Sequence, residues 1–249
     1  MSRLIGIIGG SGLQSLPDLQ DIRHERRDTA YGAPSSPLSF GMLDDRPVVF
    51  LPRHGHGHTV PPHRINYRAN IRALKDAGVS AIIGVAAVGG ITAAARPGRI
   101  VIASQLIDYT YGREHTFFDG TDGVVRHIDF TSPFDEGLRQ GLIAAAIDCG
   151  LDAAGGGIYG VTQGPRLETA AEIDRMARDG CDLVGMTALP EASLARELDI
   201  PYASCCIVAN WAAGRGDAVI TMDEIERNLA TGMEGVLGLL ACALPRLPI

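Results

Sequence analysis

The chain has 249 residues, 46% of them hydrophobic, which is enough to form one large α/β domain or two small ones. Its formal net charge of −7 argues against non-specific binding to nucleic acid, which needs a basic surface. The N-terminus lacks the apolar stretch and cleavage site of a signal peptide. Residues 77–95 are uncharged, but four glycines interrupt them, so we expect a buried strand and turn rather than a membrane span.

The five cysteines are odd in number, lack CxxC spacing and lie mostly in apolar runs: 149, 181, 205, 206 and 242. This usage is typical of reduced core thiols, and it predicts a cytoplasmic protein without disulfides.

Short apolar runs alternate with segments of helical periodicity along the whole chain. The predicted strands are 4–9, 38–43, 47–52, 81–88, 99–107, 156–162, 182–186 and 202–209. The predicted helices are 64–77, 135–149, 169–179, 190–198 and 223–243. Several strands are continuously apolar, which indicates cover on both faces. With no linker or repeat, we expect a single α/β domain over 1–249, a mixed central sheet flanked by helices. Residues 109–134 have no period and are typical of a functional or interface loop.

The first strand stops at Gly9-Gly-Ser-Gly12, where glycines surround one hydroxyl, that of Ser11. Such a loop allows backbone N–H groups to converge on an anion. The residues after it, including Pro17, do not favour the helix that follows a dinucleotide fingerprint. Three interpretations remain open here: a dinucleotide site, a site for free phosphate, and a tight turn without a ligand.

Arg53-His54-Gly-His-Gly-His58 follows the predicted strand 47–52. Histidines at alternate positions of a strand can share a metal, although no cysteine or carboxylate cluster lies nearby in the sequence. A guanidinium fork from Arg53 beside an imidazole donor from His54 is a better match to an oxyanion. A solvated turn is the third interpretation.

Four later segments place small or polar residues where predicted strands end. Val85-Ala-Ala-Val-Gly-Gly90 would allow either a ligand or a packed helix to approach the backbone closely. Glu168 lies where a helix begins and has an ordinary interpretation as a first-turn acid. Thr187 precedes another helix, and Asn210 ends an apolar strand facing the crevice where α/β proteins bind ligands.

In this order, the segments resemble the trimeric nucleoside phosphorylases, the purine nucleoside and methylthioadenosine phosphorylase family. The resemblance runs from Gly6 into the last predicted helix. It is carried by Gly9-Gly-Ser-Gly12, Arg53-His54-Gly55, Asn66-Tyr-Arg-Ala-Asn70, Gly164-Pro-Arg166 and Met186-Thr187, with Phe117-Phe-Asp-Gly120 and His127 resembling the methylthioadenosine branch.

The resemblance implies that inorganic phosphate, as a co-substrate and with no further cofactor or metal, attacks C1′ of a purine nucleoside. The implied phosphate site is Ser11, Arg53, His54, Thr187 and the backbone of Ala86 and Ala87. The implied nucleoside site is Met186, Leu167, Asn210, Trp211, Ala212 and His127, with Asn210 and His54 as the catalytic pair. A homotrimer is implied too, in which His127 serves a neighbouring subunit. No membrane or nucleic-acid partner is implied.

Glu168 and Asn210 match the 6-oxopurine nucleoside phosphorylases rather than the methylthioadenosine branch, which has other side chains there. Glu168 can accept from N1–H of a 6-oxopurine but would face the lone pair of adenine N1. The Asn210 amide can donate towards O6 and accept from N7–H. A buried carboxylate left unpaired costs about 1–3 kcal/mol, so each contact discriminates strongly between the two bases.

Met222 stands where ordinary 6-oxopurine nucleoside phosphorylases place a histidine near the ribose 5′ position. A thioether suits a 5′-methylthio group and offers no hydrogen bond to a 5′-hydroxyl. A core methionine at the start of a helix is the alternative. Together, base and sugar residues predict the substrate S-methyl-5′-thioinosine. The rival hypotheses are a methylthioadenosine or 6-oxopurine nucleoside substrate, a nicotinamide-dependent oxidoreductase, and a non-catalytic nucleotide-binding module.

Overall fold

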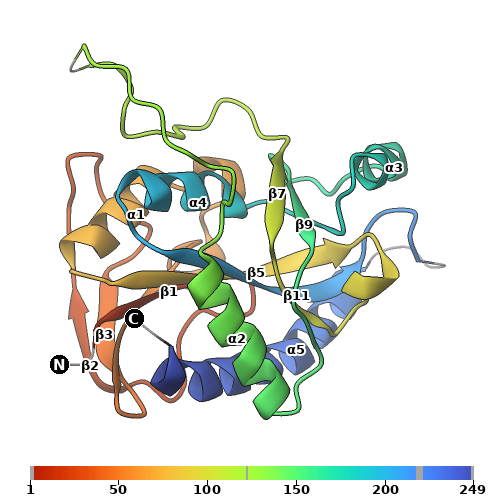
Figure 1. Ribbon diagram of the computed structural model, residues 1–249, viewed down its shortest axis with the longest axis horizontal. Helices are drawn as coiled ribbons and strands as arrows, with labels where there is room; N and C mark the ends of the chain where they lie inside the picture. Colours follow the sequence, from red (N-terminus) through yellow and green to blue (C-terminus); the bar gives the residue numbers. More distant parts are fainter. Residues whose placement is uncertain (1–2, 122, 217–220, 248–249) are drawn as a thin grey trace.

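A computed structural model describes residues 3–121, 123–216 and 221–247 (Figure 1). In these residues the strands form one mixed sheet with helices on both faces, as predicted. The strands are β1 (Ile5–Gly9), β2 (Gln20–Glu25), β3 (Leu38–Leu43), β4 (Arg46–Pro52), β5 (Ala81–Gly90), β6 (Ile100–Ile102), β7 (Gln105–Asp108), β8 (Ala153–Ala154), β9 (Ile158–Val161), β10 (Leu183–Gly185) and β11 (Tyr202–Trp211).

Strand β5 is the centre of this sheet. It pairs in parallel with β11 from Ile82 to Gly90. On its other side it pairs in parallel with β1 only as far as Gly84, and antiparallel with β10 only at Gly89 and Gly90. The stretch 85–88 therefore has no strand neighbour on that side among the described residues, and the sheet opens there.

The two faces of the sheet are covered by different helices (Figure 1). Helices α2 (Glu136–Asp148) and α5 (Met222–Ala243) pack on the face that carries Ile7 and Ile83. Helices α1 (Tyr67–Asp76) and α4 (Ala188–Glu197) pack on the face that carries Ile8 and Ile82. Helix α3 (Ala170–Arg178) packs on a third, smaller cluster. Because successive strand residues point to opposite faces, burial on both explains the continuous apolar runs.

The predicted elements lie close to the observed ones, with three exceptions, one of which is the two-residue strand β8, which was not predicted. Residues 99–107 were expected as one strand but form two, because β6 pairs with β11 and β8 whereas β7 pairs with β9. Strand β2 was not predicted, since its sequence QDIRHE is polar and it lies exposed at the edge of the sheet. Edge strands with charged side chains lack the apolar pattern of central strands.

Helix α5 is long and apolar enough to cross a membrane when judged by length and composition alone. In this fold it is a core helix, because it packs on β11 and α2 and its residues Leu239, Leu240 and Ala243 are fully inaccessible to solvent. The same core burial explains the apolar composition.

Residues 109–134 contain no helix or strand in the part that the structure describes, which excludes only Asp122. The segment leaves the end of β7 and projects from the body before the chain returns to α2 (Figure 1). Its apolar side chains Tyr111 and Val125 are 74% and 78% exposed. Such exposure on a projecting segment is typical of a protein interface.

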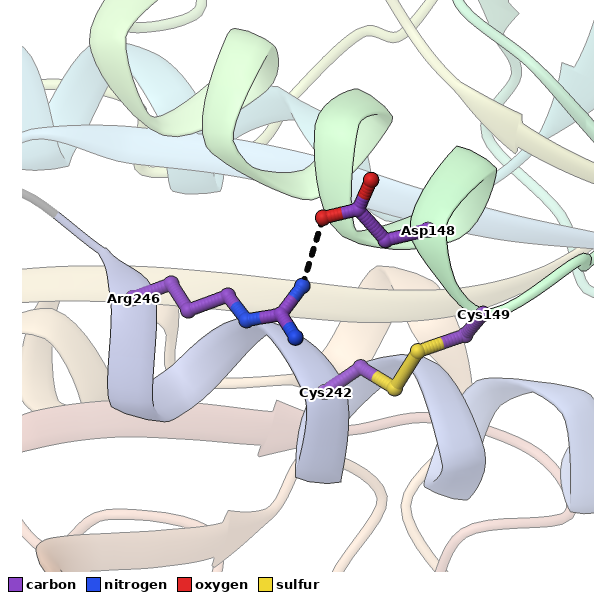
Figure 2. Close-up of a disulfide and its surroundings, with 4 residues drawn as sticks. All are labelled: Asp148, Cys149, Cys242 and Arg246. Carbon is purple, nitrogen blue, oxygen red and sulfur yellow. Dashed lines mark hydrogen bonds and ion pairs between the residues drawn. A yellow bond between two sulfur atoms is a disulfide. The ribbon is translucent and has the colours of Figure 1, made fainter.

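The prediction of five reduced cysteines is wrong at two positions. Cys149 after α2 and Cys242 near the end of α5 form a disulfide, whereas Cys181, Cys205 and Cys206 are free and buried (Figure 2). Beside the disulfide, Arg246 donates to the Asp148 carboxylate at 2.6 Å (Figure 2). The two cysteines are 93 residues apart in the sequence, so their proximity depends on the packing of α2 against α5.

This pairing predicts the number of reactive thiols. Unfolded in guanidinium without reductant, the protein should expose three thiols to a chromogenic thiol reagent, and five after reduction. Closure of so long a loop restricts the unfolded chain, so reduction should lower the free energy of unfolding by about 2–4 kcal/mol. The Cys149→Ser variant is the control, because reduction should leave its stability unchanged. Five thiols before reduction would contradict the pairing.

Candidate functional site

A cavity of about 770 Å³ opens where β5 parts from β1. Its wall includes the loop after β1, the residues after β4, the 86–89 stretch of β5, the ends of β10 and β11, and the first turns of α5. All the phosphate-site residues predicted from the sequence line it: Ser11, Arg53, His54, Ala86, Ala87 and Thr187. Residues far apart in the chain therefore meet in one place.

The glycine loop after β1 is packed too closely for larger residues. A Cβ atom on Gly10 would lie 2.7 Å from both Arg53 Nη1 and the Val85 carbonyl oxygen. Gly12 adopts a φ of 85°, a conformation that favours glycine. No helix follows the loop, since the next element is β2. The loop therefore lacks the helix N-terminus with which a dinucleotide fingerprint binds its pyrophosphate.

The opening in the sheet exposes backbone groups of β5. The Val85 carbonyl points to the β1 side of the strand, where it accepts from Arg53 Nη1 at 2.7 Å. Because peptide groups of alternate strand residues point the same way, the Ala87 peptide groups also face this side, and those of Ala86 face β11. Of the two predicted backbone contacts to phosphate, Ala87 is the one that this geometry favours.

Arg53 lies below the cavity and is only 1% exposed. Its Nε and Nη2 atoms donate to the two carboxylate oxygens of Glu191 at 2.5 and 2.8 Å, and Tyr202 also donates to Glu191 at 2.9 Å. Burial alone would lower the pKa of Arg53, but the Glu191 carboxylate raises it well above its ordinary value. The guanidinium fork predicted for phosphate is thus occupied by Glu191, and only the remaining Nη hydrogens are left for a ligand.

His54 is neutral, which corrects its predicted role as an imidazole donor. Its Nδ1 lies 2.9 Å from the Val60 carbonyl, which can only accept, so Nδ1 carries the proton and Nε2 is an acceptor. Burial and the nearby Arg53 charge lower the pKa of His54 to about 4. The His58 ring packs against it in a tilted arrangement with centroids 4.2 Å apart, and His58 Nε2 lies 3.5 Å from the Ser11 hydroxyl.

Thr187 lies where β10 passes into α4. It is 6% exposed and occupies the N-cap position, but its hydroxyl makes no capping hydrogen bond. The hydroxyl therefore has no capping role, and the non-helical backbone of Leu189 interrupts α4 two residues later. Met186, beside it, also lines the cavity. Among the described residues, no group of three or more His, Cys, Asp or Glu side chains is arranged to hold a metal ion.

The residues predicted to read the base also line the cavity: Leu167, Glu168, Asn210 and Ala212. Thr162 donates to Glu168 Oε1 at 2.6 Å. Asn210 Nδ2 donates to the Trp211 carbonyl at 2.7 Å, which leaves the Asn210 Oδ1 and a second amide hydrogen for a ligand. Trp211, also predicted for the nucleoside site, is not among the residues that line the cavity, and its side chain lies against Gly216; its contact with a nucleoside stays a prediction.

At another part of the wall, α5 contributes an apolar surface. Met222, Ile225 and Leu229 are spaced three and four residues apart, so they share one helix face, and all three line the cavity. Met222 is 63% exposed, so it is not a core methionine. His127 lies on the projecting segment 109–134 and does not reach the cavity of its own chain.

Arg113, at the base of the projecting segment, is a residue that the sequence analysis missed. It is 8% exposed and donates to four backbone carbonyls, those of Thr162, Gln163, Met186 and Leu189, at 2.6–3.0 Å. It thereby joins the segments that follow β9 and β10, which carry Glu168 and Thr187. No motif marks this arginine, because all these partners are backbone carbonyls whose positions depend on the tertiary fold.

The neutral state of His54 predicts a pH dependence of stability. Its pKa is about 4 in the folded protein, against 6.5 for an ordinary histidine, so the unfolded chain binds more protons between these values. Stability should thus fall as the pH drops through this window. Between pH 7 and pH 5, wild type should lose about 2 kcal/mol more than His54→Gln in urea unfolding. Equal losses in both proteins would show that His54 is not held neutral.

Comparison with known proteins agrees with this geometry. The Phosphorylase superfamily matches residues 4–244. The chain is 50% identical over 241 residues to the "Probable S-methyl-5'-thioinosine phosphorylase" of Xanthomonas campestris pv. campestris, covering 95% of this chain and 96% of that protein. It is 43% identical over 249 residues to the 6-oxopurine nucleoside phosphorylase of Pyrococcus furiosus, covering 98% and 93%.

Solved structures that resemble this chain are also phosphorylases. Methylthioadenosine phosphorylase from Schistosoma mansoni in complex with adenine superimposes with a TM-score of 0.93 at 33% identity, covering 98% of this chain and 91% of that one. The apo form of that enzyme gives a TM-score of 0.89 at 32% identity, covering 98% and 91%. The chain therefore belongs to the phosphorylase superfamily and is an enzyme of the purine nucleoside phosphorylase type.

Proposed function

We propose that the enzyme catalyses phosphorolysis of S-methyl-5′-thioinosine. In this reaction phosphate forms a bond to C1′ while the bond from C1′ to N9 breaks, giving 5-methylthioribose 1-phosphate and hypoxanthine. The observation that carries the proposal is the pairing of Glu168 and Asn210 at the base end with Met222 on the α5 wall of the same cavity. Relatives at 50% and 52% identity that bear the name of this activity support it.

The base end has the donors and acceptors that a 6-oxopurine requires. Glu168 Oε2 can accept N1–H, because Thr162 already occupies Oε1. The free amide hydrogen of Asn210 can donate to O6, and Asn210 Oδ1 can accept N7–H as negative charge gathers on the leaving base. A 6-aminopurine would reverse the polarity at both N1 and position 6, so the contacts at these two positions would become repulsive, while the contact at N7 would be unchanged.

The phosphate part of the cavity would bind the nucleophile, inorganic phosphate, mainly through uncharged groups. Ser11, Thr187 and the Ala87 backbone would donate to phosphate oxygens, and Arg53 would lie below them. The neutral His54 offers Nε2 as an acceptor, which can hold a proton of the monohydrogen or dihydrogen phosphate ion. A phosphate held near C1′ stabilises the ribosyl cation that forms as the base leaves.

The sugar end favours a methylthio group over a hydroxyl. The α5 residues Met222, Ile225 and Leu229 offer apolar contacts, and the exposed carboxylate Glu226 on the same helix also lines the cavity. An inosine 5′-hydroxyl placed against the apolar residues would lose hydrogen bonds to water, at a cost of about 1–3 kcal/mol. This argument favours the methylthio substrate over the activity named for the 6-oxopurine relative.

The same proposal includes a homotrimer. The segment 109–134 projects from the body with exposed apolar side chains, and its His127 lies outside the cavity of its own chain. A neighbouring subunit can therefore receive His127 at its own nucleoside site. We further propose a cytoplasmic enzyme of purine and methylthionucleoside salvage that uses inorganic phosphate and no cofactor, membrane or nucleic acid.

A substrate comparison tests this assignment. With saturating phosphate, kcat/KM should be highest for S-methyl-5′-thioinosine and at least about tenfold lower for both S-methyl-5′-thioadenosine and inosine. Release of hypoxanthine or adenine, measured by chromatography, gives the rates, and omission of phosphate is the control. A preference for S-methyl-5′-thioadenosine would reject the base assignment, and a preference for inosine would reject the sugar assignment.

Asn210→Asp replaces the side-chain amide with a carboxylate of nearly the same shape. The carboxylate would repel O6 of an oxopurine but accept from the amino group of an aminopurine, so kcat/KM for S-methyl-5′-thioinosine should fall about 10–100-fold. Turnover of S-methyl-5′-thioadenosine should rise at the same time. Asn228→Asp is a matched change at an asparagine whose amide donates to the Ala209 carbonyl at 2.7 Å. The proposal for Asn210 fails if Asn210→Asp keeps the wild-type selectivity.

A further inference from the structure

Thr162 lies one residue beyond the end of β9 and is held from several sides. Its backbone N–H donates to the Gly185 carbonyl at 2.8 Å, and its own carbonyl accepts from Arg113 Nη2 at 3.0 Å. The residue is 9% exposed. Because the main chain is fixed at both peptide groups, the position of the Thr162 hydroxyl is determined by the strand and not by the ligand.

The hydroxyl has one hydrogen and two acceptors within reach. Oγ1 lies 2.6 Å from Glu168 Oε1 and 3.2 Å from the Gly185 carbonyl oxygen. The shorter contact is to a carboxylate, and hydrogen bonds to charged acceptors are shorter and stronger than those to neutral ones. The hydrogen is therefore directed at Glu168 Oε1.

Glu168 has few other restraints. It lies in the loop before α3, and no ion pair to Glu168 is formed within the described ranges. The neighbouring Arg166 is instead paired with Glu172, at 2.7 and 2.8 Å. The contact with Thr162 is thus the hydrogen bond that fixes which Glu168 oxygen remains for a ligand, and this oxygen is Oε2.

We propose that Thr162 is a positioning residue that sets the base selectivity of the enzyme. By donating to Oε1, it holds the Glu168 carboxylate as an acceptor in front of N1, which favours a base with N1–H over one with a lone pair at N1. This inference rests on the proposed function, in which Glu168 reads the base. Without the hydroxyl, the carboxylate can rotate or rebind water, and the preference for an oxopurine weakens.

Thr162→Val and Thr162→Ser test the role, because valine keeps the shape without the hydroxyl and serine keeps the hydroxyl. The measurement is the ratio of kcat/KM for S-methyl-5′-thioinosine to that for S-methyl-5′-thioadenosine. This ratio should fall about 10–100-fold in Thr162→Val, and Thr162→Ser should keep it within about threefold of wild type. The affinity for hypoxanthine, measured by calorimetry, should fall in parallel, while that for inorganic phosphate stays unchanged.

Thr92→Val is the matched control. Thr92 also donates to a carboxylate, Asp182 Oδ1 at 3.0 Å, but neither residue lines the cavity. Loss of this hydrogen bond in Thr92→Val should leave the ratio of the two kcat/KM values unchanged. If Thr162→Val does not fold, as judged by circular dichroism, Thr162→Ala replaces it with the same expectation.

The outcomes separate the two proposals. A wild-type enzyme without preference for S-methyl-5′-thioinosine would reject the proposed function. A wild-type enzyme with that preference, together with an unchanged ratio in Thr162→Val, would reject the role of Thr162 alone. A fall of this kcat/KM ratio in both Thr162→Val and Thr162→Ser would also reject the role of Thr162. The selectivity would then depend on the shape of the side chain and not on its hydroxyl.

Discussion

Strand β5 changes its neighbour partway along, and the position of the cavity depends on this change. Up to Gly84 it is bonded to β1, and from Gly89 it is bonded to β10. Between these points one row of its peptide groups has no strand partner on that side in the described structure. Unpaired backbone groups inside a sheet need other partners, and here Arg53 satisfies one of them. A ligand anion can satisfy others, so the break in the ladder and the proposed phosphate site would have one physical origin.

The buried ion pair between Arg53 and Glu191 is the second requirement of this arrangement. Both side chains are almost fully inaccessible, so each charge is tolerable only because the other is there. Glu191 lies on α4, and Arg53 follows β4, so the pair joins the helix to the sheet below the cavity. A nearly neutral pair leaves little net positive charge for the phosphate. In the proposed function, phosphate would then be bound mainly by backbone groups and hydroxyls.

The central strands could be predicted because they depend on local pattern, whereas the grouping of the cavity residues was implied by the family resemblance. Continuous apolar runs mark strands buried on two faces, and glycines or polar residues mark their ends. The sequence did not reveal the partner of Arg53, which is 138 positions away, or the disulfide, whose cysteines are 93 apart. Nor did it reveal the tautomer of His54, which is set by the Val60 carbonyl. Each of these depends on which surfaces pack together, and no local pattern contains that information.

In the proposed function, different elements would bind the two ends of the nucleoside. Glu168 and Asn210 come from the loop before α3 and the end of β11, whereas Met222 begins α5, which packs on β11. Selection of the base relies on directional hydrogen bonds, for which a reversed donor leaves a buried group unpaired. Selection of the 5′ group relies on apolar contact, which discriminates by shape and dehydration. Because the two kinds of contact differ physically, a substitution at the base residues and one at Met222 would alter different parts of the proposed selectivity. Related phosphorylases for 6-oxopurine and methylthio nucleosides can therefore share this fold and this phosphate site.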